Sequence, residues 1–334
     1  MNDSPATPAP PTYADIAQAA ARIAGHAVLT PLLQSSALDA RVGGRVLLKP
    51  ETLQRTGSFK FRGACNKISR LIESGRRPAR IVAYSSGNHA QGVAAAAALH
   101  GLPATIVMPK DAPAIKIANT RGYGAEVVTY DRYSESREDV AARIAAQPGT
   151  ELIKPYDDPD IIAGQGTVGR EIAAQAKALG LAPSALYLPT GGGGLTAGVA
   201  LALANDLPGC AVNGVEPADF DDTGRSLKAG ARVGNDPNAR SICDALLAPT
   251  PGELTFAINA RLLQGALSVS DDEVRRAMAY AFEWLKLVVE PGGAVALAAL
   301  LAGRIEAKDR TIVIVLSGGN VDPGLFAEAL RASK

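Results

Sequence analysis

The sequence predicts an α/β fold, with strands in open, twisted and mostly parallel sheets flanked by helices. Short β-branched runs alternate along the chain with alanine-rich helical runs, an alternation typical of strand-helix units. Most of the β-branched runs are apolar on both faces, as parallel strands are when helices cover both sides of their sheet. The expected strands are residues 45–49, 80–84, 104–109, 125–130, 185–189, 212–216 and 311–316.

Helices are expected wherever apolar residues recur at helical spacing. The first follows Tyr13, where Ile16 and Ile23 share a face and Asp15 lies in the first turn. Others are expected at residues 93–100, 170–179 and 272–289. Residues 1–12 hold four prolines and are expected to form a disordered tail.

Composition and charge favour a cytoplasmic protein with small-molecule partners. The chain has 334 residues, is 47% hydrophobic and has a formal net charge of +1, without a long run of one sign that would bind nucleic acid or a membrane surface. Its three cysteines are far apart, which argues against a disulfide framework or a zinc site. It shows no run apolar enough to span a bilayer and no signal-peptide pattern at residues 1–12.

Three expected strands run directly into turns rich in glycine or serine. The turns are "SSGNHAQG" after residue 84, "TGGGG" after residue 189 and "SGGN" after residue 316. Ligands of open α/β sheets bind at the carboxyl ends of the strands, so we expect the three turns to form one composite pocket.

The four consecutive glycines Gly191, Gly192, Gly193 and Gly194 form the strongest single motif. A helical run follows them, so converging backbone N–H groups and a helix N-terminus would together bind a phosphate group. The alternative is a flexible turn or a close packing point.

Two other glycine patterns are rejected as nucleotide sites. "GQGTVG" at 164–169 matches G-x-G-x-x-G, but no acidic residue lies near 185–190, and the preceding "DDPDIIA" is interpreted as a proline turn feeding a short segment. "GNHAQGVA" lacks the Lys-Ser/Thr pair of a phosphate-binding loop. The sequence therefore argues against a dinucleotide-binding protein and against an ATPase.

Lys60 lies between Phe59 and Phe61 in "SFKFRGA". In a strand the two rings would share one face and the ammonium group would point to the other. Taken alone, this heptapeptide is better interpreted as a basic loop with a solvated lysine.

Six motifs taken together change that interpretation. "TGSFKFRGA", "SSGNHAQG", "IAGQGT", "GGGGLTAG", "EPGGA" and "LSGGN" occur in this order between residues 56 and 320. The set resembles the serine/threonine dehydratase and serine racemase family of pyridoxal-phosphate enzymes. The resemblance implies the tryptophan synthase β-like fold (fold type II) with two sheets, and a homodimer. It also implies a large cofactor-binding domain (13–72 and 156–334) and a small mobile domain (73–155).

The resemblance also implies roles in binding pyridoxal 5'-phosphate. Lys60 would form an imine with the cofactor and later act as the base, because apolar surroundings disfavour the ammonium form. Phe59 and Phe61 would flank the cofactor, and Asn88 would bind its 3-hydroxyl group. Gly191, Gly192, Gly193 and Gly194 would bind the phosphate, and Ser317 would face the pyridine nitrogen.

The implied reaction converts small 3-hydroxy amino acids, L-threonine or L-serine, into 2-keto acids and ammonia. Ser85, Ser86, Asn88 and His89 would hold the substrate carboxylate. Racemisation of serine is an alternative, with Ser86 protonating the face opposite Lys60. A third possibility is a non-catalytic binding module. The variant motif "KPETLQ" (49–54) resembles dehydratase-like proteins of hydroxyectoine breakdown.

Two further sites follow from the resemblance. "EPADFDD" (216–222) is similar to a divalent-cation loop, in which the Glu216 and Asp222 carboxylates and the Phe220 carbonyl would bind Mg2+ or Ca2+; the alternative is a solvated acidic loop. Arg137 would lie near the distal end of the substrate, where a guanidinium suits the second carboxylate of 3-hydroxyaspartate. The alternative is a surface arginine paired with Glu135 or Glu138.

Overall fold

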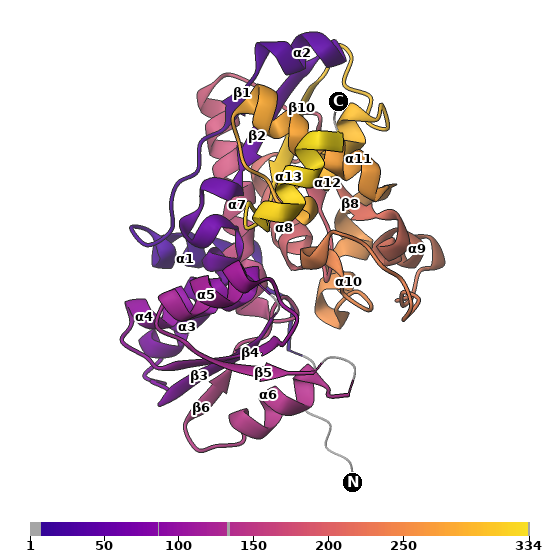
Figure 1. Cartoon of the computed structure of the whole chain (residues 1–334). Coiled ribbons are helices and arrows are strands. Elements are labelled where there is room, and N and C mark those ends of the chain that lie inside the picture. Colours follow the sequence, from indigo (N-terminus) through magenta and orange to yellow (C-terminus); the bar gives the residue numbers. More distant parts are fainter. Residues whose placement is uncertain (1–7, 86, 132–133, 333–334) are drawn as a thin grey trace.

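Two sheets organise the protein, and both are almost entirely parallel (Figure 1). The computed structural model describes residues 8–85, 87–131 and 134–332. A six-stranded sheet has the order β1 (Leu33–Gln34), β2 (Arg45–Pro50), β10 (Thr311–Leu316), β7 (Ala185–Pro189), β8 (Ala211–Pro217) and β9 (Leu263–Val269), with only β1 antiparallel. A four-stranded sheet has the order β5 (Glu126–Tyr130), β4 (Ala104–Pro109), β3 (Arg80–Tyr84) and β6 (Thr150–Leu152). The predicted α/β class is confirmed.

All seven predicted strands are present, and the three that the sequence missed lie at sheet edges. β1 has two residues and β6 has three, so neither is long enough to show a pattern. β9 follows a helix directly and contains Gly265, which obscures its alternation. The missed strands therefore have the weakest local signals.

Helices cover both faces of each sheet. They are α1 (Tyr13–Ile23), α2 (Ser36–Val42), α3 (Lys60–Glu73), α4 (Asn88–Leu99), α5 (Ala114–Gly122), α6 (Arg137–Ala145), α7 (Pro159–Ala178), α8 (Gly194–Asp206), α9 (Asp222–Ala229), α10 (Glu253–Leu262), α11 (Asp271–Tyr280), α12 (Pro291–Leu301) and α13 (Pro323–Ala332). Alternate residues of β10 show the layering: Ile312 and Ile314 pack with α12, whereas Val313 and Val315 pack with α7 and α8. The four-stranded sheet packs against α3 and α4 on one face and against α6 on the other.

The segment around residues 158–169 is a long helix, which corrects the prediction of a proline turn and a short segment. The Asp158 side chain accepts hydrogen bonds from the N–H groups of Asp160 and Ile161, and Pro159 occupies the first turn, where its missing N–H is tolerated. "GQGTVG" therefore lies inside α7 and not in the turn between a strand and that helix. This position confirms that it is not a dinucleotide-binding turn.

The predicted helix at 272–289 is too long. α11 ends at Tyr280, residues 281–285 form one π-helical turn, and Lys286 has a left-handed conformation with φ of 60°. The helix ends at this left-handed residue, and the chain then continues to Glu290, the residue before α12. Apolar spacing alone does not reveal such a turn.

A cluster of four charged side chains lies between β2, α3 and α7. Arg62 donates two hydrogen bonds to Glu51, at 2.7 and 2.8 Å, and two to Glu171, at 2.5 and 2.8 Å. Lys49 Nζ lies 2.7 Å from Glu171 Oε2. Two cations and two carboxylates balance, so α3 is joined to the six-stranded sheet without an unpaired buried charge.

None of the helices in the described ranges combines the length and the apolar character needed to cross a bilayer.

Candidate active site

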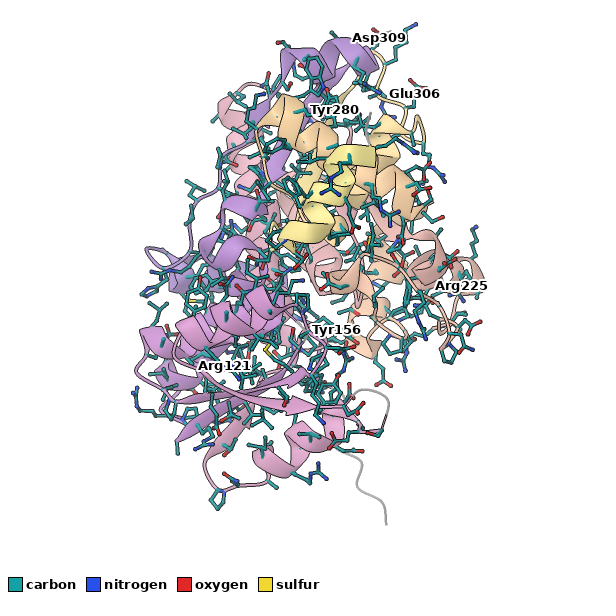
Figure 2. The ribbon with its side chains drawn as sticks, viewed as in Figure 1. Arg121, Tyr156, Arg225, Tyr280, Glu306 and Asp309 are labelled. Atoms are coloured by element: carbon teal, nitrogen blue, oxygen red, sulfur yellow. The ribbon has the colours of Figure 1, made fainter. Side chains whose placement is uncertain are left out.

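The three turns predicted to form one pocket meet at a single cavity beside the carboxyl ends of β7 and β10. Asn88, Gly191–Gly194 and Ser317 all line it, together with Lys60. Tyr156 closes one side and lies where the part built on the four-stranded sheet meets the larger part (Figure 2). The prediction of a composite pocket is confirmed.

Lys60 is the first residue of α3, and its amine is buried in the cavity wall. The Nζ atom donates a hydrogen bond to the Pro155 carbonyl at 2.8 Å and lies 5.2 Å from the centre of the Phe59 ring. Burial lowers the pKa of Lys60 to about 8. Near neutral pH a useful fraction of this amine is therefore free to act as a nucleophile or a base.

Only one of the two neighbouring phenylalanines faces the cavity. Phe59 lines it, but Phe61 is fully buried among Ala64, Ile68 and the four-stranded sheet. The expectation that both rings flank a cofactor is therefore wrong for Phe61. The segment is helical, and since each residue turns about 100° around the axis, side chains two residues apart point to nearly opposite sides.

The tetraglycine turn is held tightly and leads directly into α8. A Cβ atom on Gly192 would lie 2.5 Å from the Tyr156 ring, and Gly193 has a left-handed φ of 90°. Thr255 Oγ1 donates a hydrogen bond to the Gly192 carbonyl at 2.7 Å. The first N–H groups of α8 lie at the cavity, which suits an anion. The close-packing alternative holds for Gly192, and phosphate binding by the turn stays a prediction.

Asn88 and Ser317 complete the cavity wall. Asn88, the first residue of α4, is 7% exposed and contacts Glu290 and Asn320. Ser317 follows β10 and is 5% exposed. Both side chains are neutral hydrogen-bonding groups.

A second, more polar cavity adjoins the first and shares Lys60, Asn88, Tyr156 and Gly192 with it. Ser85, His89, Lys116 and Arg137 also line it. Ser86, which the sequence analysis assigned to substrate binding and catalysis, lies outside the described residues. Lys60 thus sits where a cavity suited to an anionic cofactor meets a cavity rich in cations and hydrogen-bond donors.

His89 is 2% exposed and electrically neutral. Burial lowers its pKa to about 3, and the nearby Lys60 adds to this effect. Its Nε2 atom lies 3.0 Å from the Ile153 carbonyl, and its Nδ1 atom has no partner among the described residues. His89 can therefore form a hydrogen bond in the cavity but not an ion pair.

Arg137 lines the polar cavity and also pairs with Glu138, and its role toward a substrate stays a prediction. Its guanidinium lies 5.5 Å from the centre of the Tyr84 ring and lines the polar cavity. Its Nε atom also donates to Glu138 at 2.7 Å. Glu135 instead accepts a hydrogen bond from the N–H of Asp131. Arg137 thus lies in the wall of the polar cavity, and about a third of its side chain is exposed.

The sequence analysis did not identify Tyr156, Lys116 or Glu290. Lys116 of α5 reaches Asp244 at 2.5 Å and lies 3.7 Å from Glu290 Oε2, although α5 belongs to the four-stranded part. Glu290 lies in "EPGGA", a motif that was recognised without a role for its glutamate. Only tertiary contacts identify the lysine, because its sequence context is that of an ordinary surface helix.

The acidic loop brings two carboxylates together away from these cavities. Glu216 is the next-to-last residue of β8 and Asp222 starts α9. Burial raises their pKa values to about 8 and about 6. Asp222 Oδ2 is buried without a hydrogen-bond partner in the described chain. Phe220 lies between them in a 3-10 turn. Within the described ranges, His, Cys, Asp and Glu form no group of three that could hold a metal, so a cation here would also need carbonyl or water oxygens.

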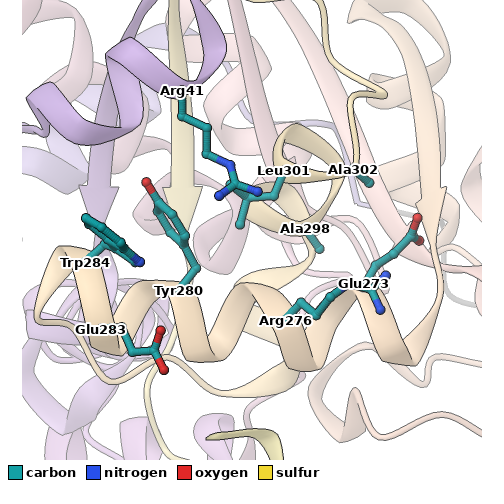
Figure 3. Close-up of a pocket in the computed structure, with 9 residues that line it drawn as sticks. All are labelled: Arg41, Glu273, Arg276, Tyr280, Glu283, Trp284, Ala298, Leu301 and Ala302. Carbon is teal, nitrogen blue, oxygen red and sulfur yellow. The ribbon is translucent and has the colours of Figure 1, made fainter. Parts of the chain in front are cut away.

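A separate surface pocket lies between α2, α11 and α12 (Figure 3). The Trp284 ring stacks on Tyr280 with centroids 6.1 Å apart, and the Arg41 guanidinium lies 5.4 Å from the centre of the Tyr280 ring. The labelled side chains include no serine, cysteine, histidine or lysine that could act as a nucleophile. We therefore assign the chemistry to the two adjoining cavities around Lys60.

Comparisons with known proteins agree with this geometry. The family described as pyridoxal-phosphate dependent enzyme matches residues 23–318. L-threo-3-hydroxyaspartate ammonia-lyase of Saccharomyces cerevisiae is 44% identical over 325 residues, covering 97% of this chain and 98% of the relative. Serine racemase of Schizosaccharomyces pombe is 41% identical, with 96% and 97% covered. The crystal structure of a threonine deaminase from T.th. superposes with a TM-score of 0.87 at 45% identity, covering 93% of this chain and 99% of that one.

Proposed function

This chain belongs to the family of pyridoxal-phosphate dependent enzymes, and on that premise we propose that it is an ammonia-lyase. Its substrates would be small 3-hydroxy amino acids, namely L-threonine, L-serine and 3-hydroxyaspartate, and its products 2-keto acids and ammonia. The observation that carries the proposal is the buried Lys60 amine, with a pKa of about 8, at the junction of the glycine-lined cavity and the polar cavity. The names of the similar ammonia-lyases support it.

The residues of the first cavity fit the cofactor. Lys60 would hold it covalently, and Gly191–Gly194 would bind its phosphate through backbone N–H groups. Asn88 would bind the 3-hydroxyl group, Ser317 would face the pyridine nitrogen, and Phe59 would pack beside the ring. The bound cofactor supplies an electron sink for the substrate α-carbon. The crowding at Gly192 supports this fit, because side chains are excluded where the phosphate would lie.

Lys60 would then move the proton. Its free amine would take the proton from the substrate α-carbon, and as the bond between Cβ and the hydroxyl oxygen breaks, the Lys60 ammonium group would return that proton to the oxygen, which leaves as water. The released enamine tautomerises and is hydrolysed to a keto acid and ammonia. The apolar environment that lowers the pKa of Lys60 is therefore also what makes it a base near neutral pH.

The polar cavity would select the substrate. Ser85, Ser86, Asn88 and His89 would hold the α-carboxylate, with His89 as a neutral partner. Arg137 at the distal wall would bind a second carboxylate, because a guanidinium pairs with a carboxylate through two parallel hydrogen bonds. 3-Hydroxyaspartate has such a group, whereas serine and threonine do not.

Serine racemisation is the second candidate function, and the Schizosaccharomyces pombe relative favours it. Ser86 would supply the proton on the face opposite Lys60. A non-catalytic binding module is the least supported, since Lys60 and Asn88 are both present in the cavity. Activity in hydroxyectoine breakdown would be a further lyase reaction at the same site.

We also propose that Glu216, Asp222 and the Phe220 carbonyl bind Mg2+ or Ca2+. The support is the pair of buried carboxylates with raised pKa values and the unpartnered Asp222 Oδ2. A divalent cation would satisfy this oxygen and favour both ionised forms.

We further propose a division into two domains, a homodimer and a cytoplasmic location. Residues 73–155 would form a small mobile domain, because the four-stranded sheet lies within them, while 13–72 and 156–334 would form the large domain. Of the tail expected at 1–12, residues 1–7 lie outside the described residues, and Thr12 instead caps α1. A homodimer would bury the exposed apolar side chains Leu53, Phe282, Trp284 and Val288. A cytoplasmic location is supported by Cys65, Cys210 and Cys243, which are unpaired.

One assay tests the main proposal. The purified protein is incubated with pyridoxal phosphate and each of L-serine, L-threonine and 3-hydroxyaspartate, with and without Mg2+, and keto acid and ammonia are measured. Chiral chromatography of residual serine separates a racemase, which yields D-serine, from a lyase. Borohydride reduction should leave the cofactor attached to Lys60. Absence of both products in protein that carries the cofactor would exclude both enzymes.

A further inference from the structure

The amide group of Asn88 is held from both ends. Its Oδ1 atom accepts a hydrogen bond from Asn320 Nδ2 at 2.8 Å. Its Nδ2 atom donates to Glu290 Oε1 in a short contact. The second Nδ2 proton has no acceptor among the described residues, and Asn88 lines the cavity around Lys60. The two neighbours therefore decide which end of this amide is the donor.

The direction of these bonds is set by a backbone carbonyl. Asn320 Nδ2 also donates to the Thr56 carbonyl at 2.8 Å. A carbonyl can only accept, so Asn320 must present its nitrogen to both Thr56 and Asn88. Asn88 must then turn its oxygen toward Asn320 and its nitrogen toward Glu290. A flipped Asn88 would place two donors together at one end and two acceptors at the other.

The turn that supplies this carbonyl is strained. Thr56 has a φ of 64°, which is unfavourable for a β-branched residue, and its buried hydroxyl has no partner among the described residues. Gly57 follows with a φ of 72°, and a Cβ atom there would lie 2.7 Å from Asn320 Oδ1. The backbone therefore adopts an unfavourable conformation at the place where it approaches Asn320.

Glu290 closes the other end as an acceptor. Its side chain is 1% exposed, and the ammonium group of Lys116 lies 3.7 Å from Glu290 Oε2. Asp244 shares the same lysine at 2.5 Å. The groups facing Glu290 are thus one cation, one carboxylate and the Asn88 amide, which together keep an oxygen available to Asn88.

We propose that Thr56, Asn320 and Glu290 are positioning residues that lock Asn88 as a hydrogen-bond donor toward the cofactor's 3-oxygen. A donor there favours the deprotonated form of that oxygen, whereas the flipped amide would favour its protonated form. The inference rests on the proposed role of Asn88 in cofactor binding. It assigns a function to the strained turn and to the glutamate of "EPGGA".

Asn320→Asp is the sharpest test, because it keeps the size of the side chain and replaces the donor with an acceptor. The Thr56 carbonyl and Asn88 Oδ1 would then both face a carboxylate, and Asn88 would flip. Protonation of the 3-oxygen should move the absorption of bound pyridoxal phosphate to shorter wavelengths, and the dissociation constant of the cofactor should rise about 10- to 100-fold. Asn119→Asp on the exposed face of α5 is the matched control and should change neither.

Substitutions of Glu290, beginning with Glu290→Gln, provide a second and independent test of how Asn88 is oriented. A glutamine can still accept through its oxygen, so the absorption spectrum should change less than in Asn320→Asp, while Glu290→Leu, which removes the acceptor, should resemble it. Circular dichroism and thermal unfolding of each variant show whether the fold survives. A spectrum and an affinity like those of the unmodified protein in folded Asn320→Asp and Glu290→Leu would overturn the inference. Failure of the unmodified protein to bind the cofactor would instead refute the proposed function.

Discussion

The two adjoining cavities around Lys60 are built in different ways. The glycine-lined cavity has one wall made of backbone, namely the Gly191–Gly194 turn, the start of α8 and the end of β10, and side chains such as Phe59 and Asn88 complete it. The polar cavity is formed by side chains, several of which come from the part containing the four-stranded sheet, such as Arg137 and Lys116. The first cavity thus depends on the path of the backbone at the glycine turn, whereas the second depends on side chains that single substitutions can replace.

This difference indicates where the protein can change. The crowded glycines of this turn tolerate few substitutions, because an added side chain would overlap its neighbours. A partly exposed arginine at a distal wall can be replaced at little cost in stability. The cofactor and the reaction type should therefore depend on the first cavity and the choice among similar substrates on the second. Three substitutions test this division, and a fourth measurement concerns the acidic loop outside both cavities.

The largest effect is expected for Lys60→Ala, which removes the group shared by both cavities. Loss of the base and of the covalent attachment should lower the rate of keto acid formation by about 1,000-fold or more. Lys177→Ala, on the exposed face of α7, is the control and should retain full activity. Keto acid formation by Lys60→Ala at a rate near that of the control would contradict the assignment.

Gly192→Ala tests the backbone cradle. The added methyl would overlap the Tyr156 ring, so we expect cofactor affinity to fall and stability to drop by about 1–3 kcal/mol. Equilibrium dialysis with pyridoxal phosphate and urea unfolding measure the two effects. Gly209→Ala, where a Cβ meets no atom within 4 Å, should leave both quantities unchanged. Equal behaviour of the two variants would mean that the turn is not a cradle.

Arg137→Ala tests the polar cavity. It should lower kcat/KM for 3-hydroxyaspartate about 10- to 100-fold, because one charged hydrogen-bonding partner of the second carboxylate is lost. Serine and threonine should be affected much less, and cofactor affinity should not change. Arg143→Ala, on the exposed face of the same helix, is the control. An equal loss for all three substrates would show that Arg137 does not select among them.

The smallest effect is expected at the acidic loop. Glu216 and Asp222 keep their protons to higher pH in the fold than in the unfolded chain, so without a cation stability falls as pH rises from about 4 through 8. Mg2+ binds the ionised forms and should raise the melting temperature by about 2–4 °C at pH 8 and less at pH 5.5. Thermal unfolding measures this. Asp222→Asn should abolish the increase, and Asp219→Asn should keep it; a pH-independent response would argue against a cation there.

The sequence predicted the backbone-built features better than the side-chain-built ones. The tetraglycine turn was identifiable because four residues without side chains between a strand and a helix have few structural roles. Lys60 was recognised only through five other motifs, since one lysine between two phenylalanines is also compatible with a surface loop. The helix-breaking conformation of Lys286 left no signal, because a left-handed lysine looks like any other lysine in the sequence.

The residues missed around the site owe their roles to partners distant in sequence. Lys116 contacts Asp244, which is 128 residues away, and Glu290 contacts Asn88 across 202 residues. Tyr156 is significant only because it packs on Gly192. Phe61 is the opposite case. It is next to Lys60 in the sequence, but its side chain lies on another face of α3 and away from the cavity. Tertiary packing, which the local pattern does not contain, decided each case.

The glycines of α7 have a consequence for altering this enzyme. A Cβ on Gly164 would lie 2.6 Å from Gly63 of α3, and one on Gly166 would lie 2.8 Å from the Gly198 carbonyl of α8. One helix thus sets the spacing between α3, which begins at Lys60, and α8, which begins in the tetraglycine turn. Variants designed to accept other amino acids should therefore keep these glycines and change the side chains that line the polar cavity.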